Sequence, residues 1–72
     1  MGELAGFSGK IVIRKLGKIG YVVIRMKGSH ARLWNDNGHP PVTVPMHKEL
    51  RVGLLRAIIK QVGLSAEEFL AL

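Results

Sequence analysis

The stretch that decides the fold is residues 21–34, YVVIRMKGSHARLW. Two runs of β-branched and aromatic residues flank a turn at Lys27-Gly28-Ser29, which is the pattern of a β-hairpin. We therefore expect antiparallel strands over 21–26 and 29–35. His30 then lies at the start of the second strand, directly after the turn and within the most basic region of the chain.

A helix is predicted before the hairpin, over residues 8–20. Ser8 has the residue type and position of an N-cap, and Gly20 has those of a left-handed C-cap. Val12 and Leu16 are spaced to share one helical face. The β-branched residues of the same segment also suit a strand, but the agreement of the two cap signals favours the helix.

Beyond the hairpin, a turn at 36–38 leads to a short third strand over 42–44. A second helix is predicted around 55–62, because its apolar residues recur at helical spacing. Residues 65–68, SAEE, have the pattern of a capping box. This box predicts a last, short helix that runs to about Leu70.

The resulting order is helix, three strands, helix and a terminal helical turn. It predicts an α+β protein in which a three-stranded antiparallel sheet has helices on one face and solvent on the other. This is the layout of the double-stranded-RNA-binding-like fold. A chain of 72 residues has room for one domain, over 1–72, and we expect residues 1–6 to be a flexible end.

The composition is strongly basic. Eleven Lys and Arg against five Asp and Glu give a formal charge of +6 and a pI of about 10.4, and no acid stands between Glu3 and Asp36. This bias favours nucleic acid as a partner, although a basic surface can also serve solubility alone. The absence of cysteine excludes disulfides and thiolate zinc sites. Because neither a signal peptide nor a membrane-spanning stretch is recognisable, we expect a cytoplasmic protein.

Several blocks of sequence, in a fixed order, resemble the HicA toxin family. They are Gly20-Tyr21, RMKGSH at 25–30, VTVPMH at 42–47, GLLRAIIKQVGLS at 53–65 and Glu68-Phe69. Each block alone is weak, but their order and spacing over about residues 8–70 are specific. The chain departs from the pattern at Leu54, because the family often has threonine after the glycine that precedes it.

The resemblance implies an mRNA interferase of a type II toxin–antitoxin system, with a double-stranded-RNA-binding-like fold and a HicB antitoxin that neutralises it. It also implies that the histidine of the family's Gly-Ser-His motif, which here is His30, is catalytic. The departure at Leu54 affects the start of a helix and leaves this motif untouched. No cofactor is implied.

Histidine suits RNA cleavage without a metal. The 2′-hydroxyl is an internal nucleophile that needs a base near neutral pH, and an imidazole with an unperturbed pKa of about 6.5 can act as one. Lys27 and Arg25 are candidates to stabilise the extra negative charge of the phosphorane. RNA would be cleaved and DNA spared. The alternative for His30 is a surface histidine on a half-exposed strand.

Other side chains have competing interpretations. His47 is either a general acid or, more simply, a loop histidine bonded to a carbonyl group, and His39 is expected to be solvated. Trp34 would stack on a base if it were exposed, but we expect it to close the core. Ser29 has no Asp–His pair, so it is expected to bind phosphate or shape the turn. Three histidines with few carboxylates make a poor metal site.

The predicted RNA-binding surface combines the hairpin with basic residues elsewhere in the chain. Its members are Arg25, Lys27, Gly28, Ser29, Lys15, Lys18 and Lys48. Lys15 and Lys18 are included because the first helix of this fold usually contacts RNA, although they also suit a solvated helix face. Three functions remain open: a ribonuclease toxin, a non-catalytic RNA-binding module of the same fold, and a domain that binds an acidic protein.

Overall fold

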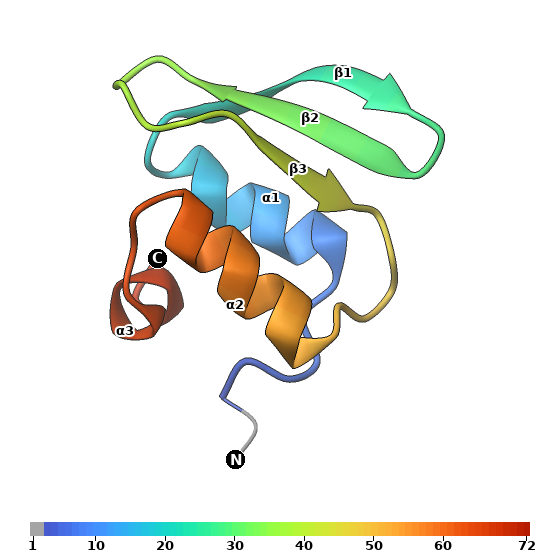
Figure 1. Ribbon diagram of the computed structural model, residues 1–72, viewed down its shortest axis with the longest axis vertical. Helices are drawn as coiled ribbons and strands as arrows, with labels where there is room; N and C mark the ends of the chain where they lie inside the picture. The colour runs from blue at the N-terminus through green and yellow to red at the C-terminus, as the bar shows by residue number, and fades with distance from the viewer. Residues whose placement is uncertain (1–2) are drawn as a thin grey trace.

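In the computed structural model, which describes residues 3–72, the main helices lie against one face of a three-stranded antiparallel sheet (Figure 1). The elements are α1 (Gly9–Gly17), β1 (Tyr21–Lys27), β2 (His30–Asn35), β3 (Val42–Pro45), α2 (Val52–Gln61) and α3 (Ala66–Leu70). The strand order is β1-β2-β3. This arrangement confirms the predicted α+β fold. Across residues 3–72, no helix has the length and apolar character needed to cross a membrane.

Local sequence signals set most of the helix ends. The Ser8 side chain accepts a hydrogen bond of 3.1 Å from the amide three residues later. Ser65 and Glu68 exchange the two bonds of a capping box, at 2.8 and 3.0 Å. α1 ends at Gly17, earlier than predicted, because glycine propagates a helix poorly. Gly20, with φ +99°, instead forms the turn into β1.

The hydrophobic core lies between the inner face of the sheet and the helices. Its large, fully buried side chains are Val12, Leu16, Leu33, Val42, Val44, Leu50, Leu55, Val62 and Phe69. Leu4 joins this core with 4% of its surface exposed. Leu4 therefore anchors the segment before α1, part of the predicted flexible end, while residues 1 and 2 lie outside the described residues.

One buried polar side chain, that of Asn35 at the end of β2, connects the sheet to the segment before β1 and to the loop after β2. Asn35 is 3% exposed, and its Nδ2 donates to the carbonyl of Ile19 at 2.9 Å. Its Oδ1 accepts from the amides of Asn37 at 2.7 Å and His39 at 3.3 Å. Because every polar atom of this side chain has a partner, its burial is not penalised, and it fixes the loop after β2.

Two sequence predictions about aromatic rings are wrong. Trp34 does not close the core but is 49% exposed, because the inward positions of β2 belong to Leu33 and Asn35 on either side of it. His39 is not fully solvated: it is half-buried, and its Nδ1 lies 2.9 Å from the carbonyl oxygen of Val62. The environment of His39 is set by a segment distant in sequence, whereas the exposure of Trp34 follows from the alternation of β2 itself.

Candidate active site

An irregularity in β1 decides which of its side chains face solvent. The ladder pairs Val23 with Leu33 and Arg25 with Arg32, which leaves Ile24 as an extra residue without a partner. This is a β-bulge, a feature that re-aims side chains and is common beside active sites. The alternation of the strand therefore changes phase at Ile24.

The change of phase turns two basic side chains outward. Tyr21 is buried at the start of β1, so regular alternation would direct Arg25 and Lys27 toward the core as well. After the bulge, Arg25 instead lies opposite Arg32, and Lys27 lies opposite His30. The basic side chains of both strands consequently gather on the outer face of the sheet, near the hairpin turn.

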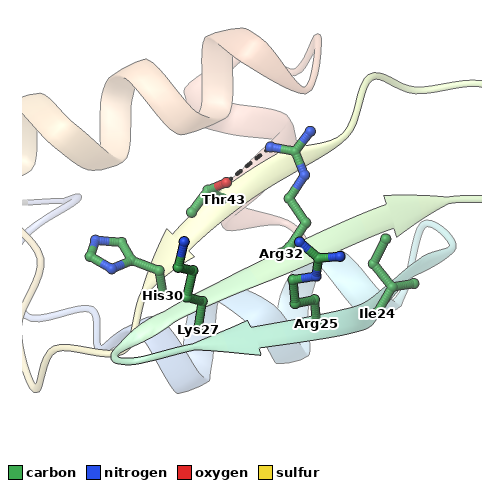
Figure 2. A pocket seen from close by; sticks show the side chains of 6 residues that line it. All are labelled: Ile24, Arg25, Lys27, His30, Arg32 and Thr43. Atoms are coloured by element: carbon green, nitrogen blue, oxygen red, sulfur yellow. Dashed lines mark hydrogen bonds between the residues drawn. The ribbon is translucent and has the colours of Figure 1, made fainter.

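These side chains line an open pocket of about 560 Å³ on the outer face (Figure 2). Its lining residues are Ile24, Arg25, Lys27, His30, Arg32 and Thr43. Nη1 of Arg32 donates to Oγ1 of Thr43 at 3.2 Å, which joins β2 to β3 across the pocket. None of the three strands contains Asp or Glu. The pocket therefore attracts anions.

The hairpin turn holds His30 at one end of this pocket. Gly28 has φ +59°, whereas Ser29 is not in the left-handed region, which is the pattern of a type II′ turn. A side chain at Gly28 would be strained by this backbone conformation. The carbonyl of Ser29 accepts a hydrogen bond of 2.6 Å from the amide of Met46, which connects the turn to the end of β3.

A second histidine lies beside His30. The rings of His30 and His47 have centroids 6.5 Å apart, and both side chains are exposed. The amide of Gly9 donates to the His47 carbonyl at 3.0 Å. Gly9 packs so closely on Pro45 that a Cβ there would overlap the Pro45 carbonyl oxygen. The start of α1 thus fixes the backbone of His47. Within residues 3–72, no three metal-ligating side chains are grouped.

The structure does not bring every predicted RNA-binding lysine to the pocket. Lys15 donates to two carbonyls of the C-terminal segment, at 3.0 and 3.4 Å, and lies over the Phe69 ring. Lys18 is exposed just past the end of α1, roughly 14 Å along the helix from the end that contacts His47. Lys48 is exposed and follows His47 directly. Of the three, only Lys48 is therefore close to the histidine pair.

Comparison with protein-family models gives a match over residues 9–64 to the HicA toxin of bacterial toxin–antitoxin systems. The match covers well over half of the 72 residues and includes the whole pocket, the hairpin turn and both neighbouring histidines. This chain belongs to the HicA toxin family. The resemblance seen in the sequence is thereby confirmed, and the Gly-Ser-His motif of HicA toxins lies here at the edge of the pocket. No curated protein matches the chain closely enough to be counted as a relative.

Sequence reasoning missed three residues that line the pocket of this HicA protein: Arg32, Ile24 and Thr43. Arg32 carried a usable signal, because it stands two residues after His30 in an alternating strand and must share its face. The sequence around Ile24 and Thr43 carried no signal that would place them at the pocket. Their positions depend on the bulge and on the register of β3 against β2, which no single segment encodes.

Proposed function

We propose that this HicA family member is a metal-independent endoribonuclease that cleaves mRNA, with His30 as the general base. The observation that carries the proposal is the placement of His30, exposed at the end of an open pocket lined by Arg25, Lys27 and Arg32. A phosphodiester bound in this pocket would lie between a base and three cations. This combination suits chemistry on a phosphate that gains negative charge.

The reaction needs only groups of the RNA and side chains at the pocket. His30 removes the proton from a 2′-hydroxyl, and the 2′-oxygen attacks the adjacent phosphorus. The bond between phosphorus and the 5′-oxygen then breaks, which leaves a 2′,3′-cyclic phosphate and a 5′-hydroxyl. The cations stabilise the negative charge of the phosphorane intermediate. DNA has no 2′-hydroxyl and is not cleaved.

His47 completes this scheme as the general acid. The departing 5′-oxygen needs a proton, and the His47 ring lies 6.5 Å from that of His30. Two imidazoles at this separation can reach opposite sides of one phosphate, because each forms a hydrogen bond of about 2.6–3.2 Å. In this scheme His30 accepts a proton and His47 donates one. Exposed Lys48 adds positive charge beside the pair.

A HicB-type antitoxin is the protein partner that we propose, and membership of a toxin–antitoxin family supports it. Such a partner would inhibit by covering His30 and excluding RNA from the pocket. The pocket is lined by cations, and the strands that carry it contain no acid. The covering surface is therefore expected to be acidic, which would also accelerate association of the two proteins.

The test is cleavage of a long single-stranded RNA in the presence of EDTA, with DNA of the same sequence as a control. The protein is compared with His30→Ala and with Lys60→Ala, a change of surface charge on α2. Circular dichroism checks that all three are folded. We expect the protein and Lys60→Ala to cleave RNA to fragments with cyclic phosphate ends, and His30→Ala to be inactive. Equal cleavage by all three would place the activity elsewhere, and RNA binding without cleavage would favour a non-catalytic binding module.

A further inference from the structure

The outer face of the sheet changes character along its length. The hairpin end carries the cations, whereas the other end exposes large apolar side chains: Val22 is 48% exposed, Ile24 57% and Trp34 49%. Val22 is the cross-strand partner of Trp34, and Ile24 itself lines the pocket (Figure 2). An apolar surface therefore continues from the pocket toward Trp34.

The strand β2 aligns this apolar surface with the proposed catalytic base. His30, Arg32 and Trp34 are exposed on one face, and the residues between them are buried. At about 3.3 Å per residue, Trp34 lies about 13 Å from His30 along the strand. Stacked nucleotides rise by about 3.4 Å each. A strand of RNA with its phosphate at His30 would therefore reach Trp34 within about four nucleotides.

The chemistry of this surface fits a nucleobase next to a phosphate backbone. Single-stranded nucleic acid is bound by cations that follow its backbone and by aromatic rings on which its bases stack. Arg25, Lys27 and Arg32 provide the cations, and the half-exposed indole of Trp34 provides a ring with open surface. The strands contain no acidic residue that would repel the phosphates.

We propose that Trp34, flanked by Val22 and Ile24, is a base-stacking subsite for single-stranded RNA. The inference rests on the proposed ribonuclease function and specifies its substrate class. The RNA runs along β2 from His30 to Trp34, and an unpaired base lies on the indole. A base inside a duplex is already stacked on both sides and does not offer its face. The subsite therefore selects unpaired RNA over duplex RNA.

Trp34 is the only tryptophan of the chain, so its fluorescence reports on this subsite alone. The experiment uses the His30→Ala variant of the 72-residue chain, which is expected to bind RNA without cleaving it. It is titrated with a short single-stranded RNA oligonucleotide, with the same RNA as a duplex, and with inorganic polyphosphate. We expect strong quenching by the single strand, weak quenching by the duplex, and none by polyphosphate, which offers charge without bases.

Substitutions at Trp34 in the same His30→Ala background then measure the contribution of stacking. Trp34→Ala is expected to weaken binding of labelled single-stranded RNA by about 5- to 150-fold, the effect of removing one stacking ring. Trp34→Phe should retain most of the affinity. Neither should change the salt dependence of binding, because stacking releases no counterions. Leu54→Ala, which alters a 40% exposed apolar side chain on α2, is the matched control and should bind normally.

The outcomes separate this inference from the function on which it rests. RNA that binds without changing the fluorescence, or Trp34→Ala with undiminished affinity, would overturn the subsite and leave the ribonuclease proposal standing. Quenching by polyphosphate equal to that by RNA would also overturn it. A folded His30→Ala variant that binds no RNA at low salt would refute the RNA-cleaving function, and the subsite with it.

Discussion

At the scale of single residues, His47 is the side chain that we propose as the second proton-transfer group. Its ring lies 6.5 Å from His30, and its carbonyl is held by the amide of Gly9. A base must be neutral to accept a proton, and an acid must be protonated to give one. A pair in these roles therefore produces a rate that rises with pH and then falls.

Replacement of His47 by alanine is expected to lower the rate of RNA cleavage by about 10²- to 10⁴-fold. The fall of the rate at higher pH should disappear from the remaining activity, because the proposed proton donor is absent. Initial rates measured across the pH range test this. A His47→Ala variant with the full bell-shaped profile would show that another group donates the proton.

Tyr21 is expected to make stability depend on pH in the alkaline range. Burial raises the pKa of its hydroxyl above the ordinary value of 10.0, and the hydroxyl donates to the Pro40 carbonyl at 2.6 Å. A pKa raised by folding stabilises the protein below the unfolded pKa, and this contribution is lost as pH rises through the folded value. We expect the protein to lose stability above about pH 10 more steeply than Tyr21→Phe does.

Urea unfolding of both proteins over a pH series measures this difference. At neutral pH, Tyr21→Phe should be less stable by about 0.5–1.5 kcal/mol, because it lacks the hydrogen bond to Pro40. The lysines titrate in both proteins, so only the difference between the two curves reports on Tyr21. If the stabilities of the two proteins fell in parallel at alkaline pH, the Tyr21 hydroxyl would not be the cause of the loss.

At the scale of elements, the caps and turns whose sequence signals lie within a few neighbouring residues were predictable. The capping box at Ser65 and the turn at Gly28 each lie within a few residues. The bulge at Ile24 was not predictable, because the run VVIRM alternates equally well in either phase and pairing with β2 selects one. The contact between Lys15 and the C-terminal segment likewise depends on a distant partner.

The same distinction applies to the site. His30, Arg25 and Lys27 were found because the hairpin and the Gly-Ser-His motif are local. Their common face was not foreseen, since it follows from the bulge. The pairing of His30 with His47 needs β3 to lie beside β2, and this register becomes known only from the folded sheet.

The close contact between the start of α1 and the end of β3 can be tested by substitution of Gly9. In Gly9→Ala, the new Cβ would overlap the Pro45 carbonyl oxygen, so α1 must shift away from β3. We expect a loss of about 1–3 kcal/mol in the free energy of unfolding, as for an overpacked core, and a lower cleavage rate because His47 moves. Denaturant unfolding and RNA cleavage assays measure the two effects.

Gly17→Ala is the matched control for this change. A Cβ at Gly17 meets no atom within 4 Å, and the residue lies at the end of the same helix. Alanine there should be neutral or should stabilise by up to about 1 kcal/mol, since it restricts the unfolded chain. Equal effects of the two substitutions would show that the contact between Gly9 and Pro45 does not position α1.

At the scale of the whole molecule, the basic residues of the pocket and Lys15 have different surroundings. Those on the outer face of the sheet surround an open pocket and are free to meet an anion. Lys15 lies instead among the helices, where its ammonium group donates to the carbonyls of Leu70 and Leu72 and contacts the ring of Phe69. It holds the C-terminal segment against α1.

This difference predicts opposite effects for two substitutions. Lys15→Met should lower the free energy of unfolding by about 1–3 kcal/mol, because the hydrogen bonds of the ammonium group to the Leu70 and Leu72 carbonyls are lost, and should leave RNA affinity unchanged. Arg32→Gln removes an exposed cation, so it should change stability little but weaken RNA binding and reduce the slope of log K against log salt by about 0.7. Urea unfolding measures the two stabilities, and RNA titrations at several salt concentrations measure the two affinities and the salt slope. If Lys15→Met instead reduced the salt slope and kept full stability, the RNA-binding surface would have to extend over α1.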